Sequence, residues 1–482
     1  MRHRHSIIVF ALLAGPGLFA QVTWRRAHGA FGPDQGTRVL VLPGDTTLAV
    51  AGTTGSFGPG TGDAYVVMMH TDGDVLASYV FGSPAVEQVG GMGIAADGGL
   101  LLAGSTDRNA ATGYDGWLMR TDADGVLQWE ITVGGTDWDF LESLEPTADG
   151  GWLAAGRTQS FGAGGMDGWL VRFDANGDTV WTAVLGTPQE DRLTDARETS
   201  DGGLVACGMR TTPDGDADAW VVKLAADRSV EWQSFVGGDS TDLARDVIVT
   251  ADGGYSIVGT TRSYSPFVEH LHAKLDANGA EQWRWNWGQV NDQEAYEHLQ
   301  LADGTYLAAG YTRTSGGGGS DMFLLSSDQG GYFTYGRTFG GVDDDEAFGL
   351  DTLPDGYLVA GRTRSYGAGN TDVFVVRTGL DGLTDQQTVE ETFDALPVPV
   401  SPDPAPVLAV FPMPAEGPFT VQASDVFVEL TVHDAAGRLI WAAPVRGRSA
   451  TLREALPIGA HVLTARLADG RVLHRSIIVQ RP

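Results

Sequence analysis

The feature that most constrains this chain is a motif that returns seven times at an almost constant interval. A glycine closes its first half at positions 51 or 52 residues apart: Gly52, Gly104, Gly156, Gly208, Gly259, Gly310 and Gly361. An acidic residue opens its second half with the same spacing: Asp63, Asp115, Asp167, Asp218, Glu269, Asp321 and Asp372. A period this regular indicates a solenoid, a propeller or another array.

Each repeat carries the signals of β-strands. Short apolar runs such as Leu153–Gly156 and Trp169–Arg172 are bounded by Asp-Gly and Asn-Gly pairs, which suit tight hairpin turns. No stretch keeps a helical period over three turns, and four strands fit in each repeat. A four-stranded antiparallel unit of about 40 to 50 residues, repeated radially, is the blade of a β-propeller.

The two ends of the repeat region complement each other. The seventh repeat lacks a fourth strand after Gly382, and a matching segment, Val22–Ala27, precedes the first repeat. Pairing the two would remove the unpaired edges that an open sheet exposes. We therefore predict an all-β chain in which residues 21–387 form a seven-bladed β-propeller with about 51–52 residues per blade. The N-terminal strand would close the last blade.

Five tryptophans share one place in the repeat, which suggests either a ligand platform or packing between blades. A binding site occupies one place on a ring, whereas these residues recur around it, so we interpret them as inter-blade packing residues. They are Trp24, Trp129, Trp181, Trp232 and Trp283.

The first residues predict export. Residues 1–20 combine basic residues, an apolar run over Ile7–Leu13 and small residues near Ala20, as in a secretory signal peptide. This run is too short to span a bilayer, and no other stretch approaches the roughly 18 apolar residues that a spanning helix needs. We therefore expect no transmembrane segment in the mature protein. We expect it to be secreted or placed on the outer-membrane cell surface. The single cysteine, Cys207, lies in an apolar strand and is interpreted as a buried structural thiol.

The net charge of −31 argues against nucleic acid and anionic lipid as partners. Alternating carboxylates at Asp214, Asp216 and Asp218 could bind Ca²⁺ or form a solvated turn. Calcium therefore stays open, and we expect no other cofactor.

The fifth repeat departs most from the others, because Glu269 is followed by His270 and His272. Residues two apart on a strand share a face, so the two imidazoles could bind a transition metal with Glu269 or with His298, or could simply be packed. No other catalytic motif is found, and we expect no catalytic residues.

As a whole, residues 21–387 resemble the secreted bacterial seven-bladed propeller repeats, in which Asp-Gly-Gly, Ala-Gly-x-Thr and Asp-Gly-Trp-Leu-Val mark each blade. Asp174–Gly177 followed by Trp181 is also similar to the tryptophan-docking turns of quinoprotein dehydrogenases. Those enzymes usually have eight blades and many use a cysteine pair, so the similarity implies a shared packing device and no shared cofactor.

After the repeats, residues 388–407 read as a Pro-rich linker, and residues 408–482 as a small Ig-like β-sandwich. Because Val426, Val428, Leu430 and Val432 alternate with other residues, we expect these four to form one buried face.

This last region resembles the type A C-terminal sorting domain of the type IX secretion system of Bacteroidota, although an unrelated Ig-like adhesive domain is the alternative. The resemblance rests on Val410–Pro414, Val432–Leu439, Leu456–Val462 and Arg475–Val479, with motif residues Pro412, Pro414, Gly417, Gly437 and Gly459. Met413 and Ala460 replace the usual Asn and Tyr. The resemblance implies the type IX secretion machinery as a partner.

Two classes of function follow. The first is a non-catalytic, secreted or cell-surface binding propeller for a glycan or protein ligand, and the second is a secreted hydrolase or lyase that acts on polysaccharide from the propeller funnel. Loops on rigid scaffolds carry function, so we expect binding at the variable segments 160–166, 210–217 and 263–268.

Overall fold

The computed structural model describes residues 22–108, 113–212, 215–288, 290–384, 389–393, 408–411, 418–434, 437–453, 456–468 and 471–479. The predicted signal peptide and most of the predicted linker lie outside these residues. The described part consists of strands and connecting turns, and it contains no helix. It accordingly contains no helix with the length and apolar character needed to cross a membrane.

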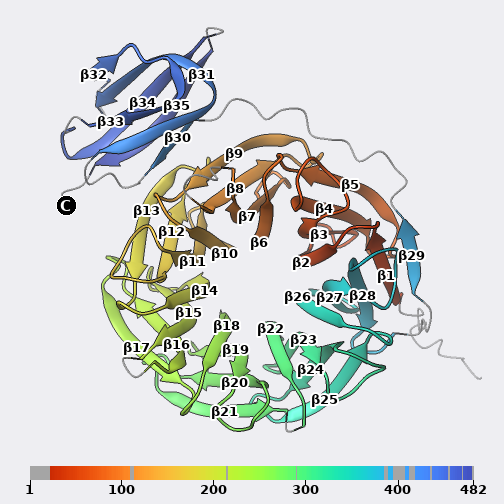
Figure 1. Cartoon of the computed structure of the whole chain (residues 1–482). Coiled ribbons are helices and arrows are strands. Elements are labelled where there is room, and N and C mark those ends of the chain that lie inside the picture. Colours follow the sequence, from red (N-terminus) through yellow and green to blue (C-terminus); the bar gives the residue numbers. More distant parts are fainter. Residues whose placement is uncertain are drawn as a thin grey trace, which may run out of the picture.

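Six four-stranded sheets and one five-stranded sheet are arranged around a ring, as in a β-propeller (Figure 1). Within each four-stranded sheet, the strands follow in chain order from the centre of the ring to its rim. The innermost strands are β2 (Asp34–Val41), β6 (Glu87–Ile94), β10 (Asp139–Pro146), β14 (Asp191–Glu198), β18 (Asp242–Val249), β22 (Gln293–Gln300) and β26 (Asp345–Leu353). The second strands are β3 (Thr47–Thr54), β7 (Leu100–Thr106), β11 (Trp152–Thr158), β15 (Leu204–Thr211), β19 (Tyr255–Thr261), β23 (Tyr306–Thr312) and β27 (Gly356–Thr363).

The third strands carry the Asp-Gly-Trp-Leu motif and its variants. They are β4 (Asp63–His70), β8 (Asp115–Thr121), β12 (Asp167–Phe173), β16 (Ala217–Leu224), β20 (Glu269–Leu275), β24 (Asp321–Ser327) and β28 (Asp372–Gly379). The outer strands are β5 (Val75–Phe81), β9 (Leu127–Val133), β13 (Thr179–Leu185), β17 (Val230–Val236), β21 (Glu281–Trp287) and β25 (Phe333–Phe339).

The hairpin between the first and second strands is fixed by an aspartate and a lysine or arginine. In the fifth sheet along the chain, the Asp252 carboxylate accepts hydrogen bonds from the Thr250 hydroxyl and from the Gly254 N–H. Lys274 on the third strand donates to the same carboxylate at 3.0 Å. The same cation–aspartate contact recurs in other sheets at Arg120–Asp97, Arg172–Asp149, Lys223–Asp201 and Arg377–Asp355. The repeated motif therefore builds a repeated turn.

The first strand of the chain, β1 (Trp24–Gly29), pairs antiparallel with β28, at the place where the sequence lacks a fourth strand. A further strand, β29 (Glu390–Phe393), runs parallel to β1 and forms the outer edge of this sheet (Figure 1). The predicted linker 388–407 therefore begins too early. Residues 390–393 add to the edge of β1, because that edge offers unpaired backbone groups.

The core of the ring lies between neighbouring sheets. One cluster, for example, joins Leu101 and Leu118 of one sheet to Trp152, Trp169 and Val171 of the next. Cys207 is fully buried in another such cluster, and burial raises the pKa of its thiol well above the usual range. The thiol is therefore a packed, protonated group, as the sequence suggests.

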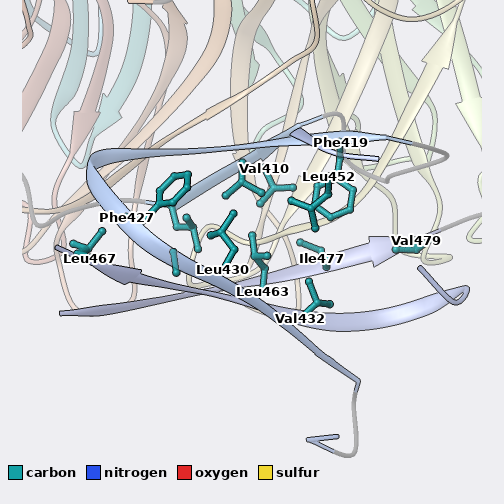
Figure 2. Close-up of a cluster of buried hydrophobic side chains, with 13 residues drawn as sticks. Val410, Phe419, Phe427, Leu430, Val432, Leu452, Leu463, Leu467, Ile477 and Val479 are labelled. Carbon is teal, nitrogen blue, oxygen red and sulfur yellow. The ribbon is translucent and has the colours of Figure 1, made fainter. Parts of the chain in front are cut away.

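A separate six-stranded sheet forms the C-terminal unit. Its strands are β30 (Leu408–Phe411), β31 (Phe419–Asp434), β32 (Leu439–Ala443), β33 (Gly447–Leu452), β34 (Gly459–Leu467) and β35 (Val472–Val479). The long strand β31 pairs with β30 and β33 near its start and with β32 and β34 near its end. Folding back on itself in this way encloses the apolar cluster that Figure 2 shows.

The prediction of the buried face of β31 is wrong for the first two of its four residues. Leu430 and Val432 are fully buried, but Val426 and Val428 are only half-buried, and Phe427 is buried instead (Figure 2). The pairing with β34 shifts register between Phe427 and Glu429. A β-bulge of this kind moves later side chains to the opposite face, which a simple alternation cannot anticipate.

Candidate functional site

Every innermost strand of the ring contains a β-bulge at the same place. The register with the second strand shifts around the fourth residue of the strand, as between Leu141 and Ser143 in β10. The other innermost strands show the same shift. The bulged residues are Thr37, Gly90, Glu142, Thr194, Arg245, Tyr296 and Phe348.

These seven residues line one cavity of about 190 Å³, together with Arg38 and Val89. We call it the central cavity. A bulge leaves its extra residue out of the hydrogen-bond ladder and redirects its side chain. The fold thus delivers one residue from each sheet to a shared space, and the sequence sets each of these residues independently.

The lining of the central cavity is strongly asymmetric. The bulged residues of the first two sheets are the small Thr37 and Gly90, whereas those of the last two are Tyr296 and Phe348, whose rings meet edge to face with centres 4.9 Å apart. The Arg245 guanidinium lies 4.6 Å from the centre of the Tyr296 ring. Aromatic side chains with a few placed polar groups are typical of ligand sites, in which the polar groups fix the orientation of the ligand.

The carboxylates beside the cavity are each held by a donor. Glu142 pairs with Arg157 at 2.6 Å. Glu294 pairs with Arg245 at 3.3 Å and accepts hydrogen bonds from the Tyr296 and Tyr311 hydroxyls at 3.0 and 2.9 Å. Burial, together with the nearby Glu294 charge, raises the pKa of both phenols, so they stay protonated and act as donors.

Arg192, the second residue of β14, differs from these residues. It is half-buried, and no hydrogen bond or ion pair of its side chain is found among the described residues, where its Nε is buried without an acceptor. Desolvation lowers the pKa of its guanidinium, Glu142 opposes this effect, and Arg245 and Arg157 add to it. Arg192 is thus a cation near Glu142 and Arg245 of the cavity lining, and no carboxylate is bound to it in the described part of the chain.

Further along the same inner strands, ion pairs fill the centre of the ring. Arg197 contacts Glu145, and also Asp195 and Asp246 at 3.3 Å each. Arg38 lies 3.4 Å from Glu297, and burial raises the pKa of Glu297 to about 7 despite this arginine. The arrangement forms a charged floor whose arginines are all paired, unlike Arg192.

The histidines of the fifth repeat lie in the core between the fifth and sixth sheets. The rings of His270 and His272 are nearly parallel with centres 6.2 Å apart, so they do share one face of β20. Both are buried, and burial lowers the pKa of His270 to about 3 and that of His272 well below the usual value. Glu269 instead accepts a hydrogen bond from Asn286.

A buried chain of hydrogen bonds links one of these histidines to the charged floor. The His298 Nδ1 lies 2.6 Å from the Asp246 carboxylate, and the Ser256 hydroxyl lies 3.0 Å from the His298 Nε2 and 2.9 Å from the His272 Nε2. No group of three or more His, Cys, Asp or Glu side chains arranged to hold a metal occurs within the described ranges. Metal binding by Glu269, His270 and His272 therefore remains a prediction.

The acidic calcium candidates lie in the loop before β16. Asp214 is outside the described residues, and the Asp216 carboxylate accepts the Ala217 N–H at 2.9 Å. Burial raises the pKa of Asp218, and the nearby charges of Asp216 and Asp242 raise it further. Whether this loop binds calcium likewise remains a prediction.

The five repeated tryptophans lie near turns of the adjoining sheet. The Trp24 indole donates to the Thr71 carbonyl, and Trp232 packs on Gly279. Trp129 and Trp283 contact Gly177 and Gly331 in the same way. The corresponding turn position facing Trp181 is Arg228, which has a φ of 71° and whose guanidinium covers that indole.

Of the sorting-domain residues, Pro412, Pro414 and Gly417 lie outside the described residues. Gly437 has a φ of 78°, and its N–H donates to the Asp434 carbonyl at the hairpin between β31 and β32. Gly459 begins β34 with a φ of 132°.

Sequence reasoning named the propeller funnel only in its hydrolase or lyase alternative, and it missed the residues that line the central cavity and an aromatic cluster linked to them through Arg157. Trp138 is 50% exposed, and its ring centre lies 6.1 Å from that of Tyr114 and 6.2 Å from that of Phe140. A signal for this cluster was present, because the position directly before the inner strand is occupied in the other repeats by Pro33, Val86, Glu190, Thr241, Asp292 and Asp344. Comparing each repeat position for unusual side chains would also have found the seven bulged residues.

No protein-family model matches the chain. Regulatory protein FlaEY of Caulobacter vibrioides is 26% identical over 329 residues, which cover 61% of this chain and 33% of that protein. The chain thus spans about a third of the length of this relative.

Several solved structures share the propeller fold. Polysaccharide lyase Uly1 is 10% identical with a TM-score of 0.46, covering 77% of this chain and 94% of that one. The β-propeller domain of the Trilobed protease from Pyrococcus furiosus is 12% identical with a TM-score of 0.42, covering 76% and 99%. PorZ, a surface component of the type IX secretion system of Porphyromonas gingivalis, is 11% identical with a TM-score of 0.40, covering 96% and 61%. At these values the likeness carries no functional argument.

Proposed function

We propose that the protein is a secreted, non-catalytic binding module that takes its ligand in the central cavity of a closed, seven-bladed propeller. The observation that carries this proposal is the set of bulged residues, one from each sheet, that converges on this cavity. The propeller supplies a rigid frame, and the differing bulged side chains supply selectivity.

Binding is favoured over hydrolysis because the carboxylates at the cavity are already engaged. Glu142 is held by Arg157, and Glu294 by Arg245 and two phenols. A glycosidase needs one free carboxylic acid and one free carboxylate across the scissile bond. The raised pKa of Tyr296 also keeps its phenol protonated, so this side chain is not available as a general base at neutral pH.

The test is a polysaccharide and glycan-array binding assay with the full chain after signal removal, in which each retained polymer is also checked for cleavage. Retention without cleavage is expected. Tyr296→Ala and Phe348→Ala should weaken retention at least tenfold, whereas Phe333→Ala, an exposed position on the outer strand β25, should not. Cleavage of a retained polymer would contradict the proposal, as would retention that is insensitive to both cavity substitutions.

We propose in addition that the C-terminal unit directs export through the type IX secretion machinery, which would place the protein outside the cell. Support comes from its sequence resemblance and from its own apolar core, separate from those of the ring. In a Bacteroidota host, removing residues 408–482 should retain the protein within the periplasm, as measured by cell fractionation. Secretion that continues without this unit would contradict the assignment.

A further inference from the structure

Three arginines from consecutive sheets meet beside the central cavity: Arg157 of β11, Arg192 of β14 and Arg245 of β18. The chain has 31 basic residues against 62 acidic ones, so a local group of cations is unexpected on composition. Arg157 and Arg245 each hold a glutamate. Arg192 has no such partner in the described part of the chain.

The Arg192 guanidinium is half-buried, and its buried Nε has no acceptor, so part of its hydrogen-bonding capacity is free for a ligand. Burying a charge without a partner is disfavoured, and a guanidinium binds a planar carboxylate through two parallel hydrogen bonds. Arg157 and Arg245 balance Glu142 and Glu294, so Arg192 leaves the group of three arginines and two glutamates with a net positive charge. This residual cation suits a carboxylate supplied from outside the chain.

Aromatic surfaces flank this cation group. On one side, the Tyr114 and Phe140 rings stack with centres 5.4 Å apart, and Trp138 is half exposed above them. The Arg157 guanidinium lies 4.5 Å from the Phe140 ring centre, which ties this cluster to the cavity. On the other side lie Tyr296 and Phe348. Aromatic faces next to hydrogen-bonding donors suit a ring with an apolar face and a polar edge.

We propose that the central cavity binds an acidic polysaccharide, with a sugar carboxylate held by Arg192 between Arg157 and Arg245 and a neighbouring sugar stacked on Trp138. This inference rests on the binding function proposed above. Because the whole molecule carries a charge of −31, it repels a polymer with dense negative charge. The expected ligand therefore alternates uronic acid with neutral sugars.

The test compares three probes at the full chain by calorimetry: hyaluronan fragments, in which uronate alternates with a neutral sugar, polygalacturonate, in which every sugar is acidic, and neutral dextran. Hyaluronan is expected to bind most tightly. Arg192→Gln should weaken the affinity for hyaluronan about 10- to 100-fold, in line with the loss of a charge-assisted hydrogen bond. Trp138→Ala, an exposed position that should not affect folding, should also weaken it.

The control is Arg120→Gln, which removes a guanidinium paired with Asp97 at a hairpin of the second sheet. It should leave the affinity unchanged. One result would overturn the acidic-ligand inference and leave the binding function standing. In that result dextran binds as tightly as hyaluronan, Arg192→Gln does not change dextran binding, and Tyr296→Ala abolishes it. If none of the three probes binds and the glycan array retains nothing, both fail.

Discussion

At the scale of single residues, Gly279 shows how the repeated indoles and turns fit together. Its φ is 81°, and a methyl group added to it would lie 2.5 Å from the Trp232 ring. Gly253, in the same sheet, has the same φ of 81° but nothing within 4 Å. The pair therefore separates the cost of the backbone conformation from the cost of the contact.

We expect Gly253→Ala to lower the free energy of unfolding by about 1–2 kcal/mol, the usual cost of a side chain at positive φ. Gly279→Ala should lower it by about 1–3 kcal/mol more, because the methyl group overlaps the indole. Urea unfolding of the two variants measures both values. Equal losses would show that the indole moves aside at no cost.

His270 makes the stability of the ring depend on pH. The imidazole is buried with neither nitrogen hydrogen-bonded, and burial lowers its pKa to about 3, against 6.5 in a solvated state. The unfolded chain therefore takes up a proton first as the pH falls. Stability should decline from pH 6.5 towards pH 3, by up to about 1.4 kcal/mol per pH unit.

His270→Met, which introduces the residue found at the matching Met322, should reduce this decline in acid unfolding followed by tryptophan fluorescence. The buried His272 would account for what remains. His70→Met is the control, because His70 is exposed. An unchanged pH profile in His270→Met would mean that this imidazole is not buried in a neutral form.

At the scale of elements, β1 and β29 occupy neighbouring places in one sheet but contribute differently. β1 covers the edge of β28 and buries Trp24, whereas β29 only adds an outer strand to β1. Deleting residues 22–29 should expose the edge of β28 and remove an indole worth about 3–5 kcal/mol. We expect aggregation in light scattering and a lower unfolding temperature.

Deleting residues 390–393 is the matched control for the β1 deletion. It should leave a four-stranded sheet like the other six, and hence a monomer with nearly the same unfolding temperature. If both deletions are tolerated equally, β1 does not close the ring, and the closed propeller proposed above is wrong.

The strands themselves were predictable from the sequence, and the central cavity was not. Asp-Gly turns and apolar runs act locally, so each strand of the repeat could be placed from its own residues, as for Trp152–Thr158. The bulges at Glu142 and its counterparts add one residue to a ladder, which the alternation of side chains does not reveal. The same cause misplaced Val428 in the C-terminal sheet.

At the scale of the whole molecule, the core of the C-terminal unit is separate from the apolar clusters of the ring among the described residues. The apolar cluster of the C-terminal unit contains only residues from Leu408 onward, and no cluster of the ring includes any of them. Arg475 joins the two parts, since it pairs with Asp178 at 2.9 Å and donates to the Gly177 carbonyl. This ion pair is largely buried, but it is a single polar contact beside the apolar clusters that each part buries on its own.

Calorimetry of the full chain should therefore show two transitions. A chain that ends at residue 393 should keep the ring transition within about 2 °C of its original temperature. Arg475→Ala should likewise leave both transitions nearly unchanged while increasing proteolysis between residues 393 and 408. A single cooperative transition that is lost on truncation would show that the ring needs the C-terminal unit.

The pairing of β1 with β28 also sets the order in which the protein can be completed. Trp24 leaves the ribosome early, but its partner Arg377 follows only after all the inner and second strands of the ring have been made. Contacts between segments so distant in sequence form slowly, because the chain between them must first be ordered. A chain interrupted before β28 therefore keeps an N-terminal strand without its partner, so the ring can be completed only at the end of synthesis.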